Sequence, residues 1–335
     1  MTPKSSPICN YLALGAFACR ARQLVRLRKR MDLNGRAALI TGGSRGLGLL
    51  IAREFLKRGC KVLICARSQD ELDRAIDTLY AFGEAYAFVA DITREEDCRL
   101  LFERAVALFG TVDILVNNAG AILSGPFETM KAEDYRTLLE THFWGPYRMV
   151  ELVLPTMRKL RRGRIVNISS IGGKLAVPHL LPYSVSKFAL QGYSEGLRAE
   201  VMQDGIYVTT VCPSLMRTGS QLNALFKGEH RTEYSIFKTM SAFPGFSIAA
   251  DRAAKRIVRA AEYGEGTVLV GAAAKVAESM HAAAPSTVDA LFRVAAKMLP
   301  RSSNSVARRG RDIRIPRVAQ FLSRSIDSAA KDYNE

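Results

Sequence analysis

The sequence predicts an α/β protein in which a parallel sheet of about seven strands carries helices on both faces. From residue 36 onward, short apolar runs alternate with longer stretches of helical periodicity. The apolar runs are continuous, as in strands buried on both sides, and helices join such strands in parallel sheets. The 335 residues are 48% hydrophobic and 24% charged, which is enough apolar material for one sizeable core.

The expected elements follow one another in strand–helix order. Strands are predicted at residues 37–41, 61–66, 85–90, 112–117, 164–169, 207–211 and 267–270. A first helix is predicted after the glycine-rich turn that follows the first strand, and it ends at about residue 58. Further helices are predicted at residues 70–80, 94–109, 131–158, 183–203 and 251–262. The helix at 131–158 should break or bend near Gly145. We therefore expect one domain at residues 34–271, with a basic and apolar extension at 1–33 and a basic helical extension at 272–335.

The formal net charge of +16 belongs almost entirely to the two extensions. Residues 1–31 contain seven Lys and Arg and no acid, and residues 293–324 contain nine against one acid. Basic arms can bind nucleic acid, but neither extension shows a nucleic-acid motif or interleaved aromatic residues. We predict no nucleic-acid partner. Contact with an anionic membrane surface and a solvated tail remain as two interpretations.

The apolar segment at residues 8–19 precedes a basic run. Its twelve residues are too few for a spanning helix, which needs about 20. The segment also resembles a secretory signal in length, but only Lys4 precedes it, and we favour a retained interfacial anchor. None of the six cysteines is spaced like metal ligands, and no metal site is predicted. Buried free thiols at Cys60, Cys65 and Cys212 indicate a reducing compartment. A cytoplasmic protein, peripheral at the membrane face, is expected.

A glycine-rich turn, Thr41-Gly42-Gly43-Ser44-Arg45-Gly46-Leu47-Gly48, follows the first predicted strand and opens the first helix. Glycine permits a tight turn and a close approach of the backbone to a pyrophosphate, which a helix N-terminus attracts. An ordinary βα turn is the alternative, but the strand before and the helix after favour a dinucleotide site. The candidate cofactor contacts in the turn are Gly42, Ser44, Arg45, Gly46, Leu47 and Gly48.

The second strand is followed by Arg67, with no acid at the place where NAD-binding proteins hold the ribose hydroxyl. Arg45 lies in the turn itself. Two guanidinium groups suit a 2′-phosphate, because they supply positive charge and paired donors. We therefore predict NADP(H) over NAD(H).

Tyr183 and Lys187 stand four residues apart on a predicted helix, so they share one face. A tyrosine has a pKa of about 10, and a nearby ammonium is expected to lower that pKa by stabilising the phenolate. The phenol would then exchange a proton near neutral pH. Ser170 lies thirteen residues upstream of Tyr183.

Together these residues resemble the short-chain dehydrogenase/reductase family, over about residues 34–271. The turn is similar to the family's TGxxxGxG, and Ser170, Tyr183 and Lys187 are similar to its catalytic serine and YxxxK. Further similar segments are Asp91 after the third strand, Asn117-Asn118-Ala119-Gly120 after the fourth, and Pro213 to Thr218, in which Ser214 replaces a glycine.

The resemblance implies a Rossmann-like domain that transfers hydride between nicotinamide and a carbonyl or alcohol carbon. It implies that Tyr183 donates the proton in reduction, that Ser170 polarises the substrate oxygen, and that Lys187 tunes Tyr183 and binds the nicotinamide ribose. Cofactor contacts implied outside the turn are Asp91, Asn118, Ala119, Gly120 and Thr218. Members of the family commonly form homo-oligomers through their long helices.

His142 departs from the family pattern, which has an asparagine that helps to hold a proton-relaying water. Histidine exchanges protons near neutral pH, so His142 is a candidate catalytic relay. A buried, hydrogen-bonded structural histidine is the alternative.

The segment after Thr218 is rich in large apolar residues, namely Leu222, Leu225, Phe226, Tyr234, Phe237, Met240, Phe243 and Phe246. They could line a pocket for a hydrophobic carbonyl or alcohol of lipid-, steroid- or retinoid-like character, or pack against the core or a partner subunit. Two other classes of function remain: an NADP-binding scaffold with impaired catalysis, and a membrane-recruited regulatory protein.

Overall fold

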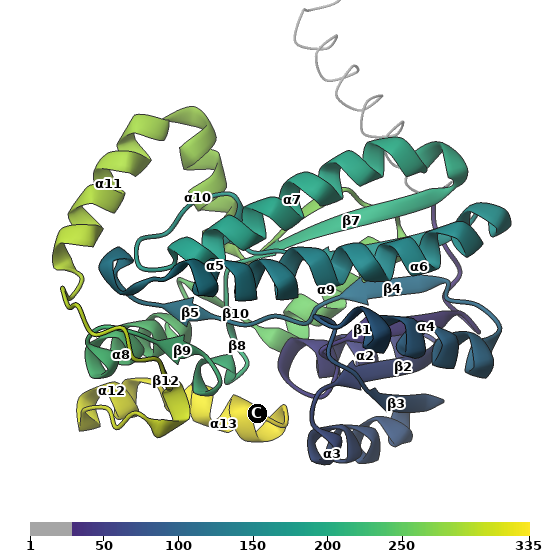
Figure 1. The fold of residues 1–335 in the computed structure, drawn as a ribbon, viewed down its shortest axis with the longest axis horizontal. Helices are drawn as coiled ribbons and strands as arrows, with labels where there is room; N and C mark the ends of the chain where they lie inside the picture. The colour runs from purple at the N-terminus through teal and green to yellow at the C-terminus, as the bar shows by residue number, and fades with distance from the viewer. Residues whose placement is uncertain (1–28) are drawn as a thin grey trace, which may run out of the picture.

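The central sheet of the computed structural model has seven strands, and every pairing within it is parallel (Figure 1). The structure describes residues 29–335, apart from the side chains of residues 317, 318, 322, 324 and 325. The strands are β1 (Ala37–Thr41), β2 (Lys61–Ala66), β3 (Ala85–Val89), β4 (Ile114–Asn117), β6 (Gly163–Ile168), β7 (Ile206–Pro213) and β11 (Thr267–Val270). Their order is β11-β7-β6-β4-β1-β2-β3, which confirms the predicted sheet.

Helices cover both faces of the sheet, as predicted. One apolar core lies under α2 (Gly46–Leu56), α3 (Gln69–Leu79) and α9 (Ala250–Glu262). The other lies under α4 (Glu95–Phe109), α6 (Gly145–Leu160) and α7 (Leu181–Val201). Successive side chains of a strand point to opposite faces, so Ile40 belongs to the first core and its neighbour Leu39 to the second.

The direction in which strands are added reverses between β1 and β4. The strands β2 and β3 extend the sheet on one side of β1, while β4 starts the other side. Thr41 at the end of β1 pairs with Asn117 at the end of β4. Ligands of open α/β sheets bind outside the carboxyl ends of the strands at such a reversal. The glycine-rich turn after β1 and the segment after β4 therefore face the same site.

The helix predicted at residues 131–158 consists of three pieces. It begins as α5 (Ala132–Leu139), continues as a π-helical turn at Glu140–Trp144, and becomes α6. The expected irregularity near Gly145 thus falls at the junction. The π-helical turn contains His142, which is 1% exposed, and such turns are frequent at functional sites.

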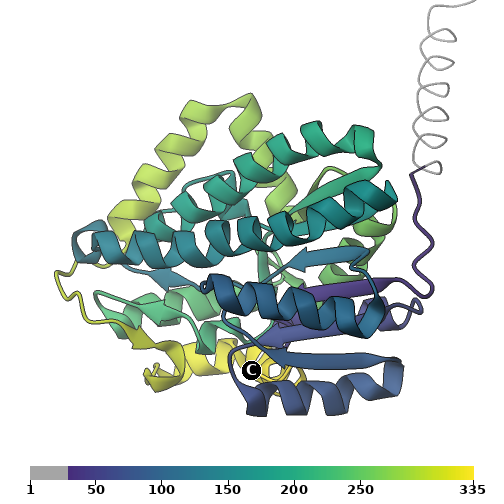
Figure 2. The same ribbon diagram turned by 45° about the vertical axis from the view of Figure 1, so that its right-hand side comes forward.

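Beyond β11 the chain forms a helical hairpin, α10 (Ala272–Ala283) and α11 (Pro285–Met298), which projects from the sheet domain (Figures 1 and 2). It then returns along the segment that follows Thr218. There, β12 (Arg308–Arg309) pairs with β9 (Leu225–Phe226), which also pairs with β5 (Leu123–Ser124).

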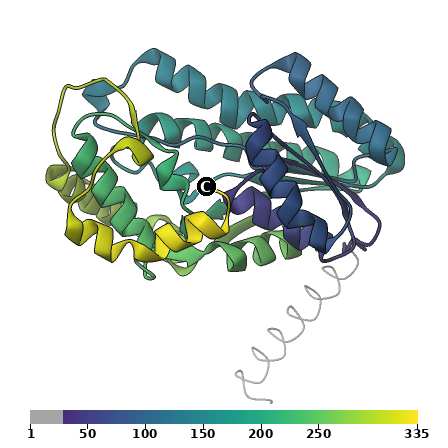
Figure 3. The same cartoon turned by 90° about the horizontal axis from the view of Figure 1, so that it is seen from below.

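Two short helices, α12 (Arg317–Leu322) and α13 (Arg324–Asp332), contact α8 (His230–Ala242). The strands β8 (Leu215–Arg217) and β10 (Ser247–Ala249) pair nearby. Figure 3 shows α12 and α13 lying along the domain, in contrast to the projecting hairpin. The last part of the chain is therefore packed on the sheet domain.

Four cysteines, Cys60, Cys65, Cys98 and Cys212, are buried free thiols, which confirms the prediction for three of them. Burial raises the pKa of Cys65 to about 12, so this thiol is inert at neutral pH. The predicted anchor at residues 8–19, with Cys9 and Cys19, lies outside the described residues. From residue 29 onward, the structure contains no helix that is both long enough and apolar enough to cross a membrane.

Candidate active site

The glycine-rich turn is packed so closely that several of its positions, Gly42 and Gly48 among them, exclude a side chain. A Cβ on Gly48 would lie 2.0 Å from the carbonyl oxygen of Gly42, and a Cβ on Gly42 would lie 2.7 Å from Cα of Ala119. Gly42 and Gly46 also have positive φ angles of 64° and 54°, which glycine adopts at least cost. The bare backbone and the N-terminus of α2 form a cradle that fits a dinucleotide pyrophosphate.

Asn118 and Ala119 join the segment after β4 to this turn. The backbone N–H groups of both residues donate to Thr41 Oγ1 at 3.1 Å. Asn118 Nδ2 donates to the carbonyl oxygens of Thr41 at 3.1 Å and Gly42 at 2.8 Å. Asn118 therefore holds the two loops of the cofactor site in a fixed relation.

Ser170, Tyr183 and Lys187 come together beside the end of β6. Ser170 follows that strand, and its Oγ accepts from the N–H of Gly172 at 3.0 Å. Ser170 also lies next to the Tyr183 ring, since a Cβ on Gly172 would be 3.4 Å from Ser170 Oγ and 3.2 Å from Tyr183 Cε1. Lys187 Nζ lies 5.8 Å from the centroid of the Tyr183 ring and donates to the carbonyl oxygen of Ile168 at 2.8 Å. The predicted catalytic set is thus assembled.

The electrostatics of this set differ from the sequence expectation. Burial raises the pKa of Tyr183, while the hydrogen bond from Ser170 acts in the opposite direction. Burial also lowers the pKa of Lys187 to about 7. Because Lys187 is only partly protonated at neutral pH, it stabilises the phenolate less than a full charge would. Desolvation, and not the position of Lys187 four residues along the helix, therefore decides the direction in which the pKa of Tyr183 shifts.

His142 uses both ring nitrogens in hydrogen bonds. Its Nε2 accepts from the N–H of Ala121 at 3.0 Å, so Nδ1 carries the proton and donates to Ser186 Oγ at 2.7 Å. Ser186 Oγ in turn donates to the carbonyl oxygen of Tyr183 at 2.8 Å. Burial and the charge of Lys187 hold the pKa of His142 well below its usual value. These contacts agree with the hydrogen-bonded structural histidine.

The two arginines proposed for a 2′-phosphate have different surroundings. Arg45 Nη1 lies 2.6 Å from Glu71 Oε1, and Arg45 Nε lies 3.4 Å from Glu335 Oε2. The Arg67 side chain is 76% exposed, and its Nη1 lies 3.9 Å from Asp91 Oδ2. Arg67 is therefore available to a ligand, while Arg45 already has two acidic partners.

Of the other predicted cofactor residues, Ser44 and Leu47 belong to the turn, Thr218 lies against Gly46, and Gly120 lies against His142. Ser44 is 3% exposed and donates to Glu71 Oε2 at 3.1 Å. Leu47 is 8% exposed. A Cβ on Gly120 would lie 3.1 Å from His142 Nε2. Thr218 is 2% exposed, and its Oγ1 accepts from the N–H of Ser220 at 3.1 Å.

Sequence reasoning does not indicate three residues beside the turn: Glu71, Asn223 and Glu335. For Glu71 a local signal exists, because Ser68-Gln69-Asp70-Glu71 has the form of a capping box. Ser68 Oγ accepts from the N–H of Glu71 at 3.4 Å, which places Glu71 in the first turn of α3. Asn223 and Glu335 reach the turn only through the packing of distant segments.

Of the apolar residues predicted after Thr218, Leu222 and Leu225 are half-buried, and the others fall into two groups. Phe226 and Tyr234 are buried in a small cluster of their own, with Phe237 packed against it. Met240, Phe243 and Phe246 are 43%, 58% and 51% exposed. Only the second group is open to a ligand.

A parallel sheet with a dinucleotide turn and a Ser–Tyr–Lys set at its carboxyl edge defines a nicotinamide-dependent oxidoreductase of Rossmann-like fold. The sequence matches the short chain dehydrogenase family over residues 36–225. The protein belongs to that family of NAD(P)-dependent oxidoreductases.

Relatives and solved structures agree with this assignment. A "Dehydrogenase/reductase SDR family protein 7-like" of Anopheles gambiae is 38% identical over 205 residues, 59% of this chain and 64% of that protein. A "3-ketodihydrosphingosine reductase" of Bacteroides thetaiotaomicron is 38% identical over 181 residues, 54% of this chain and 64% of that protein. A short-chain dehydrogenase from Streptomyces avermitilis superposes with a TM-score of 0.69 at 30% identity, covering 80% of this chain and 99% of the other. The match spans just under two thirds of the length of the two sequence relatives.

Proposed function

We propose that the protein interconverts hydrophobic carbonyl compounds and alcohols with NADP(H), and that Tyr183 is the proton donor in reduction. The observation that carries this proposal is that Ser170 and Tyr183 lie side by side at Gly172, with Lys187 one helical turn along α7. A carbonyl oxygen that approaches both hydroxyls would receive a hydrogen bond from each.

The chain's own residues polarise the substrate and move the proton. The bound nicotinamide supplies or accepts the hydride. The Ser170 hydroxyl orients and polarises the carbonyl oxygen, and the Tyr183 phenol gives that oxygen its proton. The raised pKa of Tyr183 keeps the phenol protonated at neutral pH, as a proton donor requires. Lys187, held by the carbonyl oxygen of Ile168, restores charge balance when the phenol has lost its proton.

The test is NADPH oxidation with a panel of hydrophobic ketones and aldehydes, comparing the wild type with Tyr183→Phe. Turnover by the wild type that falls at least about 100-fold in the variant supports the proposal, since general acid catalysis contributes about 10²–10⁴-fold. If no carbonyl is reduced although NADPH binds equally well to both proteins, the chain is a nucleotide-binding scaffold and not a reductase.

The choice of NADP(H) rests on the exposed guanidinium of Arg67 and on Arg45 in the turn. A 2′-phosphate would take the place of acidic partners at Arg45 and of solvent at Arg67. We expect Arg67→Ala to raise the Kd for NADPH and to leave the Kd for NADH unchanged. Equal effects on both cofactors would contradict the assignment.

The hydrophobic substrate class rests on Met240, Phe243 and Phe246, which present apolar surface after the predicted nicotinamide segment. One relative carries the name of a reductase of 3-ketodihydrosphingosine. We expect Phe243→Ser to raise KM for long-chain ketones more than for short ones. A uniform change in KM would place the substrate elsewhere.

We also propose a homo-oligomer and peripheral contact with the cytoplasmic membrane face. Val185 and Phe188 are 40% and 43% exposed on α7, and Trp144 is 42% exposed in the π-helical turn before α6, which suits a subunit contact. Light scattering should show a dimer or tetramer, and Phe188→Glu should shift the protein toward monomer.

Flotation with anionic vesicles tests the membrane contact, by comparing the full chain with a chain that lacks residues 1–31. The shortened chain should lose vesicle binding and keep its turnover in solution.

A further inference from the structure

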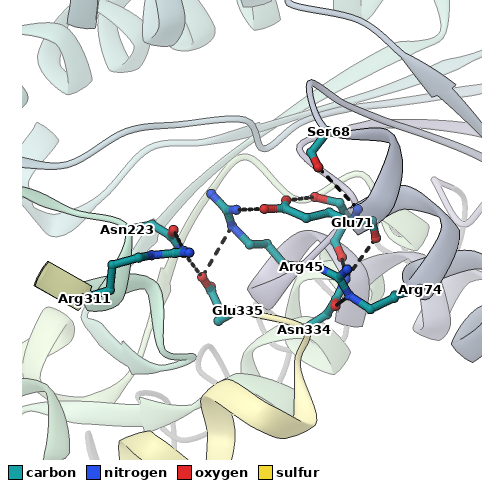
Figure 4. A network of polar contacts seen from close by, with 9 residues as sticks. Arg45, Ser68, Glu71, Arg74, Asn223, Arg311, Asn334 and Glu335 are labelled. Carbon is teal, nitrogen blue, oxygen red and sulfur yellow. Dashed lines mark hydrogen bonds and ion pairs between the residues drawn. The ribbon is translucent and has the colours of Figure 1, made fainter. Parts of the chain in front are cut away.

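The segment after α13, Tyr333-Asn334-Glu335, lies on the cofactor turn (Figure 4). Its backbone engages the first residue of α2, because the carbonyl oxygen of Tyr333 accepts from the N–H of Gly46 at 2.8 Å. That N–H is one of the groups at a helix N-terminus that have no partner within the helix. The segment therefore uses a donor that an anionic ligand of the turn would also use.

Asn334 binds the segment to the cofactor turn and to α3. Its Nδ2 donates to the carbonyl oxygen of Ser44 at 2.7 Å and to that of Glu71 at 2.9 Å. Its Oδ1 accepts from Arg74 Nε at 2.8 Å. The whole side-chain amide is thus paired with the turn and with α3, which are about 260 to 290 residues away along the chain.

Glu335 places a carboxylate against the N-terminus of α2. The side chain is 4% exposed, and Oε2 lies 3.4 Å from Arg45 Nε. Oε2 also accepts from Asn223 Nδ2 at 2.6 Å. Oε1 stands 2.6 Å from the point that a Cβ on Gly46 would occupy. The Glu335 carboxyl group is therefore held beside Arg45 (Figure 4) and against Gly46 of the glycine cradle.

A pyrophosphate bound by the turn needs this same place. It would use the N-terminal N–H groups of α2 and the positive end of its dipole. The Gly46 N–H, however, is bonded to Tyr333, and Arg45 is paired with Glu335. Two anions so close to each other would also repel. We propose that the segment Tyr333–Glu335 is an autoinhibitory plug, which the dinucleotide has to displace in order to bind. The inference rests on the proposed use of a dinucleotide at this turn.

The helix that carries the plug has its own attachment to the domain. Asp327 accepts from Lys238 Nζ at 2.7 Å, and the Lys238 side chain is 6% exposed. Ala330 packs closely on Gly219, since a Cβ on that glycine would lie 2.5 Å from Cβ of Ala330. These contacts favour an opening in which residues 333–335 leave the turn while α13 stays in place. The short tether keeps the plug at high effective concentration, so binding and plugging form a reversible competition.

The plug also responds to pH. Burial raises the pKa of Glu335 to about 7, against the lowering influence of Arg45 and Asn223, while Glu71 and Arg311 face the same carboxyl. The docked carboxyl therefore holds a proton at a pH where a free one has lost it. Docking weakens as pH rises from the ordinary pKa of a glutamate to about 7, because the docked state binds more protons over this range, and it levels off above.

Calorimetric titration of the full chain with NADPH tests the competition. The variants are a deletion of residues 333–335, and Glu335→Gln, which preserves packing if the deletion disturbs folding. Lys331→Ala is the control, because Lys331 is exposed on α13. A plug that is closed in nine molecules of ten weakens apparent binding about tenfold. We expect the deletion to lower the Kd about tenfold, Glu335→Gln to lower it by a smaller factor, and the control to leave it unchanged.

Hydrogen exchange supplies a readout that needs no turnover. Saturating NADPH should increase exchange at residues 333–335 of the wild type. Equal or weaker binding by both plug variants, or greater protection of the segment with NADPH, overturns the inference. Either result leaves the proposed reductase intact, because dinucleotide binding is then still observed. If neither the wild type nor any variant binds NADPH or NADH, both the plug and the cofactor assignment fail.

Discussion

Gly48 makes the closest approach in the cofactor turn, and Gly48→Ala should damage both stability and cofactor binding. The added Cβ would meet the Gly42 oxygen at 2.0 Å and Asn118 Nδ2 at 2.5 Å. Relief of these overlaps requires the backbone to shift, which overpacking data place at roughly 1–3 kcal/mol. The two hydrogen bonds of Asn118 Nδ2 would be lost or weakened, at about 1 kcal/mol each. The unfolding free energy should fall by roughly 3–5 kcal/mol in total.

The matched control is Gly196→Ala on α7, since a Cβ there would meet no atom within 4 Å. Alanine exceeds glycine in helix propensity by about 0.8–1.0 kcal/mol, so this variant should be more stable than the wild type. Urea unfolding of both proteins, followed by circular dichroism, gives the two values with opposite sign. NADPH titration should show binding lost only in Gly48→Ala. A loss of unfolding free energy below about 1 kcal/mol in Gly48→Ala would refute the reasoning, because it would show that the backbone of the turn can shift with little loss of stability.

Three further outcomes are expected. His142→Ala should lose about 2–3 kcal/mol of unfolding free energy, because two hydrogen bonds break and a cavity forms. His142→Asn should lose less. A large loss of turnover with unchanged stability in His142→Asn would instead favour His142 as a proton relay. Burial lowers the pKa of Lys187 to about 7, so above pH 7 this side chain holds fewer protons in the folded protein than in the unfolded chain. The unfolding free energy of the wild type should therefore rise with pH between about 7 and 10, relative to Lys187→Met, by up to about 1.4 kcal/mol per pH unit. Parallel stability curves for the two proteins would contradict the lowered pKa. NADPH affinity should increase from about pH 5 to 7 more steeply in the wild type than in Glu335→Gln, and identical slopes in calorimetry would show that Glu335 does not control docking.

Local sequence patterns predicted most of the helices and strands of the sheet domain. The strand predicted at 61–66 coincides with β2 (Lys61–Ala66), and the helix predicted at 70–80 differs by one residue at each end from α3 (Gln69–Leu79). The helix α8 (His230–Ala242) and the π-helical turn at Glu140–Trp144 are absent from the prediction. Both depend on tertiary contacts: α8 is positioned by α12 and α13, and the π-helical turn holds a buried His142 bonded to Ala121.

The sequence by itself determined the sheet, the glycine turn and the Ser170–Tyr183–Lys187 set, because each is written in short-range spacing that the backbone converts directly into geometry. The tertiary structure alone decided the ionisation of that set, since burial and not spacing raises the pKa of Tyr183 and lowers that of Lys187. It alone also brought Glu335 to Arg45. A contact between residues almost 300 positions apart leaves no periodicity in the sequence, and only the folded chain closes such a loop.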